Sequence, residues 1–112
     1  MIYNYMFMNF RRKKRAYERI PICLDIKVLN GDIQHIGLVT NLSENGMYFI
    51  SGANLSSGLN IEVSIPFKKN YIMVPVKVIR RKKDNIYDGF GAELTNPYQD
   101  YIDFVHSLKT RS

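Results

Sequence analysis

Apolar and polar residues alternate along most of the chain after residue 20, which is the pattern of half-buried β-strands. The alternation is clearest in residues 22–28, 59–67 and 72–78, where every second residue is Ile, Leu, Val or Phe. Further strands are predicted near residues 34–40, 47–51 and 87–94. The pattern therefore predicts six short strands.

Short polar segments and single residues predict how these strands connect. Asn30-Gly31 favours a two-residue hairpin turn, because both residues tolerate positive φ. Pro75 has no N–H to donate, so we expect it at a sheet edge or a bulge. Gly89 and Gly91 indicate bending of the last strand, or close approach of another backbone or a ligand. Six strands with tight turns favour a closed antiparallel barrel, which removes exposed edges.

The periodicity becomes helical after residue 95. Asn96 suits the N-cap and Pro97 the first helical position. Five apolar or aromatic side chains then follow at helical spacing: Tyr98, Tyr101, Ile102, Val105 and Leu108. The chain is thus predicted to be mainly β: a six-stranded antiparallel β-barrel (19–95), a C-terminal α-helix (96–109) and a flexible basic N-terminal arm (1–18).

The first fifteen residues divide into an apolar part and a basic part. Eight of residues 1–10 are apolar or aromatic, and five cations follow at residues 11–15. A secretory signal has the reverse order, with its charge first. We expect residues 1–10 to pack on the barrel or on a second copy of the chain. The alternative is a contact with a partner or a membrane surface, which the adjoining basic run would support.

Composition narrows the class of protein and of partner. One hundred and twelve residues make one domain, and a net charge of +6 favours an anionic partner. The single cysteine, Cys23, provides no internal disulfide and fits a cytoplasmic location. With only His35 and His106 beside it, no zinc-type ligand cluster is expected, and no cofactor either. No apolar run approaches the ~20 residues that span a membrane.

Two short polar segments carry the candidate chemistry. Arg15 and Arg19 lie four residues apart at the end of the basic run, and Asn41-Leu-Ser-Glu-Asn-Gly46 lies between apolar stretches. The guanidinium fork matches phosphate oxygens and the O6 and N7 acceptors of guanine, and it also stacks on bases. The second segment is expected to be a turn that offers an amide, a hydroxyl and backbone N–H groups. Gly46 is expected to take a positive φ there.

In this order and at this spacing, RxxxR followed by [D/N]xSxxG, the chain resembles the PilZ domain family. Residues 89–94, Gly-Phe-Gly-Ala-Glu-Leu, also resemble the last strand of that family. The resemblance runs from about Arg15 to Leu108. It implies a small β-barrel with a C-terminal helix that binds the bacterial second messenger cyclic di-GMP and is not an enzyme.

The resemblance assigns roles to particular residues. Arg15 and Arg19 would clamp guanine and phosphate from the arm, while Asn41, Ser43 and Gly46 would hold the ligand from the barrel. Accessory contacts are expected from four further positions: Arg11, Arg12, Lys14 and Gly91. In PilZ proteins the residue before the first motif arginine, here Lys14, helps to decide whether one ligand or an intercalated pair is bound. The five cations of the arm favour the pair.

Two other functions stay open at this point. A small barrel with a basic arm, eight Tyr and six Phe would suit single-stranded nucleic acid, although no DNA partner is expected. A PilZ-fold domain that only binds a protein is the other alternative. For the receptor we expect an unidentified protein effector that detects the ordering of the arm against the barrel, and a homodimer is possible. No constellation of catalytic residues indicates an enzyme.

Overall fold

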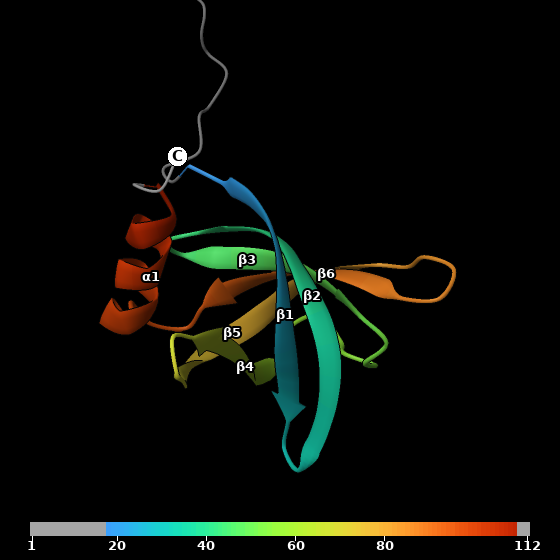
Figure 1. Cartoon of the computed structure of the whole chain (residues 1–112). Coiled ribbons are helices and arrows are strands. Elements are labelled where there is room, and N and C mark those ends of the chain that lie inside the picture. The colour runs from blue at the N-terminus through green and yellow to red at the C-terminus, as the bar shows by residue number, and fades with distance from the viewer. Residues whose placement is uncertain (1–17, 110–112) are drawn as a thin grey trace, which may run out of the picture.

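The alternating segments form six strands in the computed structural model, which describes residues 18–109 (Figure 1). These are β1 (Ile20–Asn30), β2 (Ile33–Ser43), β3 (Gly46–Ser51), β4 (Asn60–Phe67), β5 (Asn70–Lys82) and β6 (Asp88–Leu94), followed by α1 (Gln99–Lys109). All pairings are antiparallel, in the order β1-β2-β3-β6-β5-β4, and β4 pairs with β1 to close the barrel. The predicted fold class is confirmed. Of the predicted arm, residues 1–17 lie outside the described residues.

The hairpin between β1 and β2 turns one residue later than predicted. Asn30 pairs with Ile33, so the two turn residues are Gly31 and Asp32. Gly31 has a φ of 62°. A glycine with positive φ at the first turn position is what a type II′ hairpin requires, and the right-handed twist of the strands favours that turn.

Three strands are longer than the sequence pattern indicated, and each contains a shift of register. The shift lies between Pro21 and Leu24 in β1, between Val39 and Asn41 in β2, and between Val78 and Arg80 in β5. A bulge adds one residue and breaks the alternation of faces, which conceals the rest of the strand from a period-two analysis. Pro75 lies just beyond the last β5–β6 pair, Val76 with Leu94, where its lack of an N–H costs no ladder hydrogen bond.

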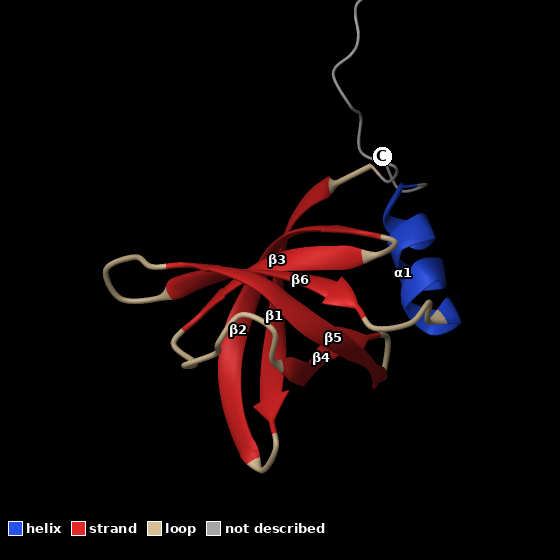
Figure 2. Ribbon diagram, turned by 180° about the vertical axis from the view of Figure 1, so that it is seen from behind, coloured by secondary structure: helices blue, strands red, loops and turns tan. Residues whose placement is uncertain are grey.

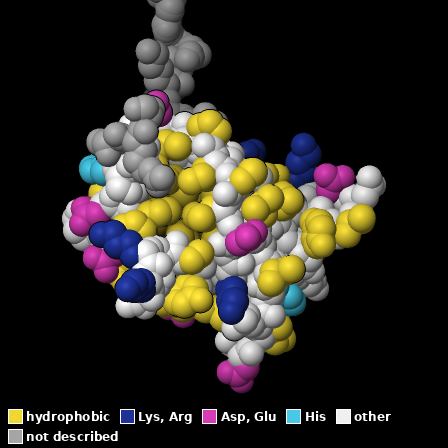
Figure 3. All heavy atoms as spheres, in the orientation of Figure 1, with side chains coloured by type: hydrophobic (Ala, Val, Ile, Leu, Met, Phe, Trp, Pro, Cys, Tyr) yellow, Lys and Arg dark blue, Asp and Glu magenta, His cyan; other side chains and the backbone are white. Residues whose placement is uncertain are grey.

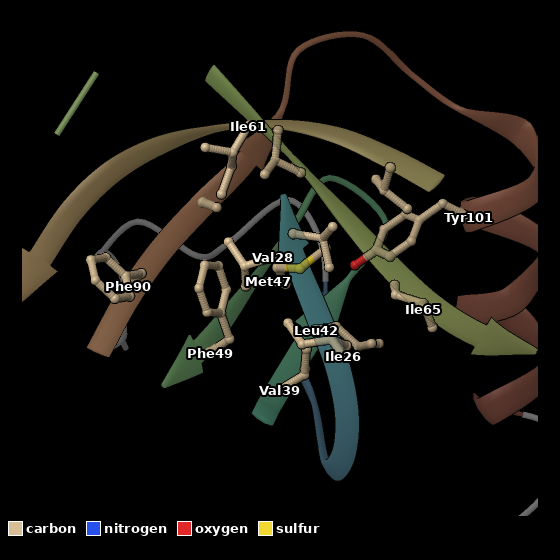
Figure 4. Packing of buried hydrophobic residues seen from close by; sticks show 14 of the residues in the cluster. Ile26, Val28, Val39, Leu42, Met47, Phe49, Ile61, Ile65, Phe90 and Tyr101 are labelled. Carbon is tan, nitrogen blue, oxygen red and sulfur yellow. The ribbon is translucent and has the colours of Figure 1, made fainter. Parts of the chain in front are cut away.

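The barrel interior is filled by apolar side chains from all six strands (Figure 4). Phe49 of β3 and Phe90 of β6 pack against each other in this core with their ring centroids 5.4 Å apart. Both side chains are fully buried. Each fully buried aromatic or aliphatic side chain contributes on the order of 2 kcal/mol of transfer free energy, so this core holds the strands in one register.

Helix α1 packs beside the β2–β3 turn (Figures 1 and 2). It begins at Gln99, later than the predicted Asn96 cap, and its first hydrogen bond runs from the Ile102 N–H to the Tyr98 carbonyl. Tyr101 points from α1 into the core, and its hydroxyl donates to the Gly46 carbonyl at 2.8 Å (Figure 4). Phe104 packs edge-on against Phe67, with their ring centroids 5.2 Å apart. Between residues 18 and 109, no helix is both long and apolar enough to cross a membrane.

Candidate functional site

A row of paired residues crosses five neighbouring strands on the outer surface of the barrel. Pro21 of β1 pairs with Asn41 of β2, which pairs with Tyr48 of β3. Tyr48 pairs with Gly91 of β6, which pairs with Arg80 of β5. Paired residues of adjacent antiparallel strands point to the same face of the sheet. The register therefore gathers an amide, a phenol and a guanidinium in one line.

Strand β6 makes room in this row because it has glycines where its neighbours have large side chains. A Cβ atom on Gly91 would lie 3.2 Å from Cγ and Nε of Arg80. A Cβ atom on Gly89 would collide with the hydroxyl of Tyr48. The side chains of Arg80 and Tyr48 therefore lie flat across β6. The sequence predicted bending or the approach of another backbone or a ligand at these two glycines, whereas the approaching groups are side chains of neighbouring strands.

Three residues of this row, Asn41, Tyr48 and Arg80, line a groove of about 620 Å³, the basic groove. Its lining residues are Arg19, Asn41, Tyr48, Arg80, Arg81 and Lys82. Four of these six are cations, and none is a carboxylate. A groove lined by one sign of charge attracts anions, and an aromatic ring in its wall offers a surface on which a base can stack.

Two side chains that enter the basic groove are held by neighbours. Nη1 of Arg19 donates to Oδ1 of Asn41 at 2.6 Å, which joins the residue before β1 to β2. Arg81 forms an ion pair with Asp88 at 2.6 Å, and its Nη1 donates to Oδ1 of Asn54 at 2.8 Å. The hydrogen bond from Arg81 is the main reason why the pKa of Asp88 lies below its usual value. Arg81 is thus a structural cation, whereas Arg80 and Lys82 are exposed at the rim.

The segment Asn41–Gly46 was predicted to be a turn throughout, but most of it belongs to strands. Asn41 and Ser43 belong to β2, Gly46 begins β3, and the turn consists of Glu44 and Asn45 alone. The bulge beside Asn41 hides the end of the strand from pattern analysis. Ser43 is buried, and its hydroxyl donates to Oδ1 of Asn45 at 3.0 Å, so it closes the turn locally.

The predicted positive φ of Gly46 is wrong. Positive φ occurs at Gly31 and Gly58 among the described glycines. A Cβ atom on Gly46 would lie 2.5 Å from the carbonyl oxygen of Ala92, a backbone atom that cannot easily move away. Gly46 is required because β6 passes too close for any side chain. A glycine in the sequence can indicate either a tight turn or a close contact between strands, and the sequence alone does not distinguish the two.

Glu44 joins the turn to the end of the helix. Its Oε2 accepts a hydrogen bond from Nζ of Lys109 at 2.8 Å and lies 3.0 Å from Nε2 of His106. The hydrogen bond from Lys109 is the largest of the effects that hold the pKa of Glu44 below its ordinary value. Gly46 is tied to the same helix through Tyr101, whose pKa is raised by burial. The β2–β3 turn and α1 therefore form one connected unit.

The structure brings together part of the site expected from the sequence. Arg19 and Asn41 meet in the basic groove, Gly91 lies beneath the Arg80 side chain that lines it, and Ser43 and Gly46 lie at the neighbouring turn. Four expected contacts lie outside the described residues: Arg11, Arg12, Lys14 and Arg15. Sequence reasoning missed Tyr48 and the cations of β5. The run Arg80-Arg81-Lys82-Lys83 was the available signal, because it follows directly on a predicted strand.

The fold and the groove define a class of protein: a small β-barrel module with a basic, aromatic-walled groove on its surface. The sequence profile of the PilZ domain matches residues 13–105. The chain therefore belongs to the PilZ domain family. No curated protein sequence matches the chain significantly.

Solved structures show the same fold. The inhibitor of motility MotI/DgrA of Bacillus subtilis has a TM-score of 0.69 and 18% identity, with 91% of this chain and 54% of that chain covered. The PilZ domain of YcgR from Escherichia coli, solved with c-di-GMP, has a TM-score of 0.71 and 11% identity, with 86% of this chain and 88% of that chain covered. The PilZ domain of CeSA from a cellulose-synthesizing bacterium has a TM-score of 0.64 and 22% identity, with 82% of this chain and 98% of that chain covered. The chain spans about half the length of MotI/DgrA.

Proposed function

We propose that the chain is a bacterial cyclic di-GMP receptor domain that acts in the cytoplasm as a signalling module and not as an enzyme. The observation that carries this proposal is the hydrogen bond between Arg19 and Asn41 at the mouth of the basic groove. It joins one residue from each of the two family motifs, although they are 22 positions apart in the sequence. The cyclic di-GMP bound in the YcgR structure supports the same ligand class.

The groove offers groups that match the chemistry of this ligand. A cyclic dinucleotide carries two phosphates and two guanines. Arg19 would hold a phosphate or the O6/N7 edge of a guanine with its fork, and Arg15 would do the same from the arm. Tyr48 has a partly exposed ring on which a base can stack, and Arg80 adds a second fork across Gly91. Asn41 would position Arg19, while Ser43 and Gly46 would keep the turn in shape.

The signal would pass to a protein effector when the arm is ordered against the barrel. Arg15 and Arg19 are in the chain immediately before β1, so a ligand that both arginines hold would fix this segment beside Asn41. Ordering of a segment by charge-assisted hydrogen bonds is a common way to make a new surface for a partner. The accessory cations Arg11, Arg12 and Lys14 would strengthen the same contact.

Calorimetric titration of the full chain with cyclic di-GMP tests this function. We expect saturable binding of cyclic di-GMP and no binding of a single-stranded oligonucleotide of mixed sequence. Lys27→Ala is the matched control, because Lys27 is an exposed cation outside the basic groove. If the folded chain binds the oligonucleotide and not cyclic di-GMP, the groove serves single-stranded nucleic acid and the proposal is wrong.

A further inference from the structure

A second hollow lies on the outer surface of the barrel, away from the basic groove, and it is mainly apolar. It has a volume of about 580 Å³ and lies over β1, β2, β3 and β4. We define the apolar face by six of its lining residues: Ile36, Leu38, Ile50, Pro66, Tyr71 and Tyr87. Figure 3 shows apolar side chains gathered on this side of the molecule.

The apolar face is more than a scatter of exposed apolar residues. Ile36 is 73% exposed and Tyr71 is 58% exposed. Leu38 pairs with Ile50 and Pro66 pairs with Tyr71, so two apolar pairs flank the hollow, with Asp25 and Lys27 of β1 between them. In a sheet with one face on the core, the outward positions are normally polar. A mainly apolar hollow on a small domain indicates that something covers it.

Sequence and chain length indicate what covers it. Residues 1–10 contain eight apolar or aromatic side chains and no charged side chain. Residues 11–17 separate them from Glu18, and a link of seven residues spans up to ~23 Å when extended. From Glu18 the chain runs seven residues to Asp25 at the near edge of the hollow, a distance of at most ~23 Å at ~3.3 Å per residue. The link is therefore long enough to bring residues 1–10 back to the hollow.

Tethering favours this segment over other occupants. A segment joined by a short link has an effective concentration in the millimolar range, well above that of a second copy at micromolar concentration. A membrane surface would need a protruding contact, whereas this site is concave. The charged side chains in the lining, Asp25 and Lys27, balance each other, so the hollow itself favours an uncharged apolar segment such as residues 1–10. We propose that residues 1–10 dock into the hollow of the apolar face of their own chain.

The chain contains no tryptophan, so the fluorescence of a single introduced tryptophan in the hollow reflects the surroundings of the hollow alone. Tyr71→Trp places this probe at an exposed position in the apolar face. In the full chain we expect the emission of a shielded tryptophan. Changing Tyr5, Phe7 and Phe10 together to Ser gives a polar-tail variant of the same length, and its emission should shift to longer wavelength. Unchanged emission would overturn the proposal.

A double-mutant cycle tests the same contact without a probe. Ile36→Glu should lower the melting temperature of the full chain by on the order of 5 °C, because it places a charge against a docked apolar segment. In the polar-tail variant the same change should have little effect, since residues that do not touch contribute independently. Equal losses in both backgrounds would contradict docking. Ile33→Glu is the matched control, because Ile33 is 58% exposed and does not line the hollow.

Sedimentation of the full chain distinguishes the remaining occupants. We expect a monomer at micromolar concentration, with or without Ile36→Glu. A dimer that Ile36→Glu dissociates would show that a second copy covers the face, and the proposal would fail. It would also fail if the tryptophan emission of the Tyr71→Trp variant became shielded only on addition of vesicles that contain acidic lipid.

Discussion

At the scale of single residues, the side chain of Arg19 is held by an acceptor on the neighbouring strand. The Arg19–Asn41 hydrogen bond measures 2.6 Å and lies at the mouth of the basic groove. A side chain that is already positioned loses less conformational freedom when a ligand binds. We therefore expect Asn41 to contribute through the orientation of Arg19 in addition to any direct contact with the ligand.

Arg19→Ala should weaken cyclic di-GMP binding by about tenfold or more, since a bidentate guanine contact contributes ~1–3 kcal/mol. Arg19→Lys should weaken cyclic di-GMP binding as well, because an ammonium lacks the two-pronged donor of a guanidinium. Arg19 is exposed, so the melting temperature should stay nearly constant. Calorimetry beside thermal unfolding checks both statements. Wild-type affinity in either variant would remove Arg19 from the site, and we expect the same outcome for Arg15→Ala.

Gly89→Ala should weaken ligand binding through Tyr48. The new methyl group would collide with the Tyr48 hydroxyl and push the ring off β6. The ring lies on the outer surface, so the barrel should still fold. Tyr48→Ala should weaken binding to a similar extent, and the two changes together should cost little more than either alone. Additive losses, measured by calorimetry on the same four proteins, would mean that Tyr48 and Gly89 act separately.

At the scale of elements, β-bulges limit how far the strands could be predicted. The alternation in residues 72–78 identified β5, but the extra residue at Ile79 reversed the faces and concealed the continuation to Lys82. The bulge beside Asn41 likewise made the end of β2 resemble a loop. Pairing with the neighbouring strands extends both elements, and pairing is not visible in local periodicity. Residues 59–67, which have no bulge, were predicted almost to the residue.

The link between the β2–β3 turn and α1 should make stability depend on pH. The pKa of Glu44 is lowered in the folded chain, chiefly by the hydrogen bond from Lys109. Its contribution is therefore complete above the ordinary glutamate pKa and is lost as the pH falls through the lowered value. Glu44→Gln should cost about 1 kcal/mol at neutral pH and much less at about pH 3.

Thermal unfolding of both proteins at the two pH values measures this difference. Glu62→Gln serves as the control, because Glu62 is an exposed carboxylate on β4, far along the chain from α1. A loss that is equal at both pH values would show that Glu44 acts through packing, and that its charge does not hold the helix.

At the scale of the whole molecule, positive charge is concentrated in the basic groove and in the sequence that precedes β1. The basic groove contributes Arg19, Arg80 and Lys82 beside the ion-paired Arg81, and residues 11–15 are all cations. This exceeds what the two phosphates of one cyclic di-GMP require, whereas an intercalated pair brings four phosphates together. We predict two ligand molecules per chain and an affinity that falls steeply with added salt. Calorimetry at saturation gives the ratio directly, and a ratio of one would assign the surplus cations to another partner.

The residues of the candidate site could be predicted only where they belong to a short sequence motif. Two motifs pointed to Arg19 and Asn41, and the structure joins them by a hydrogen bond. Tyr48 and Arg80 enter the same groove because β3, β6 and β5 pair in one register. That register depends on the packing of Phe49, Phe90 and the rest of the core, which no short motif records. Gly46 was predicted to allow a tight turn, whereas the structure requires a glycine there because β6 passes close by.

Strand β3 carries both outer surfaces on consecutive outward positions. Tyr48 lies in the basic groove and Ile50 in the apolar hollow, while Met47 and Phe49 face the core. Insertion of one residue would turn both outward side chains inward at once. In evolutionary terms the two surfaces are linked at this strand: a lineage can change the residues there, but a change of register would lose both surfaces together.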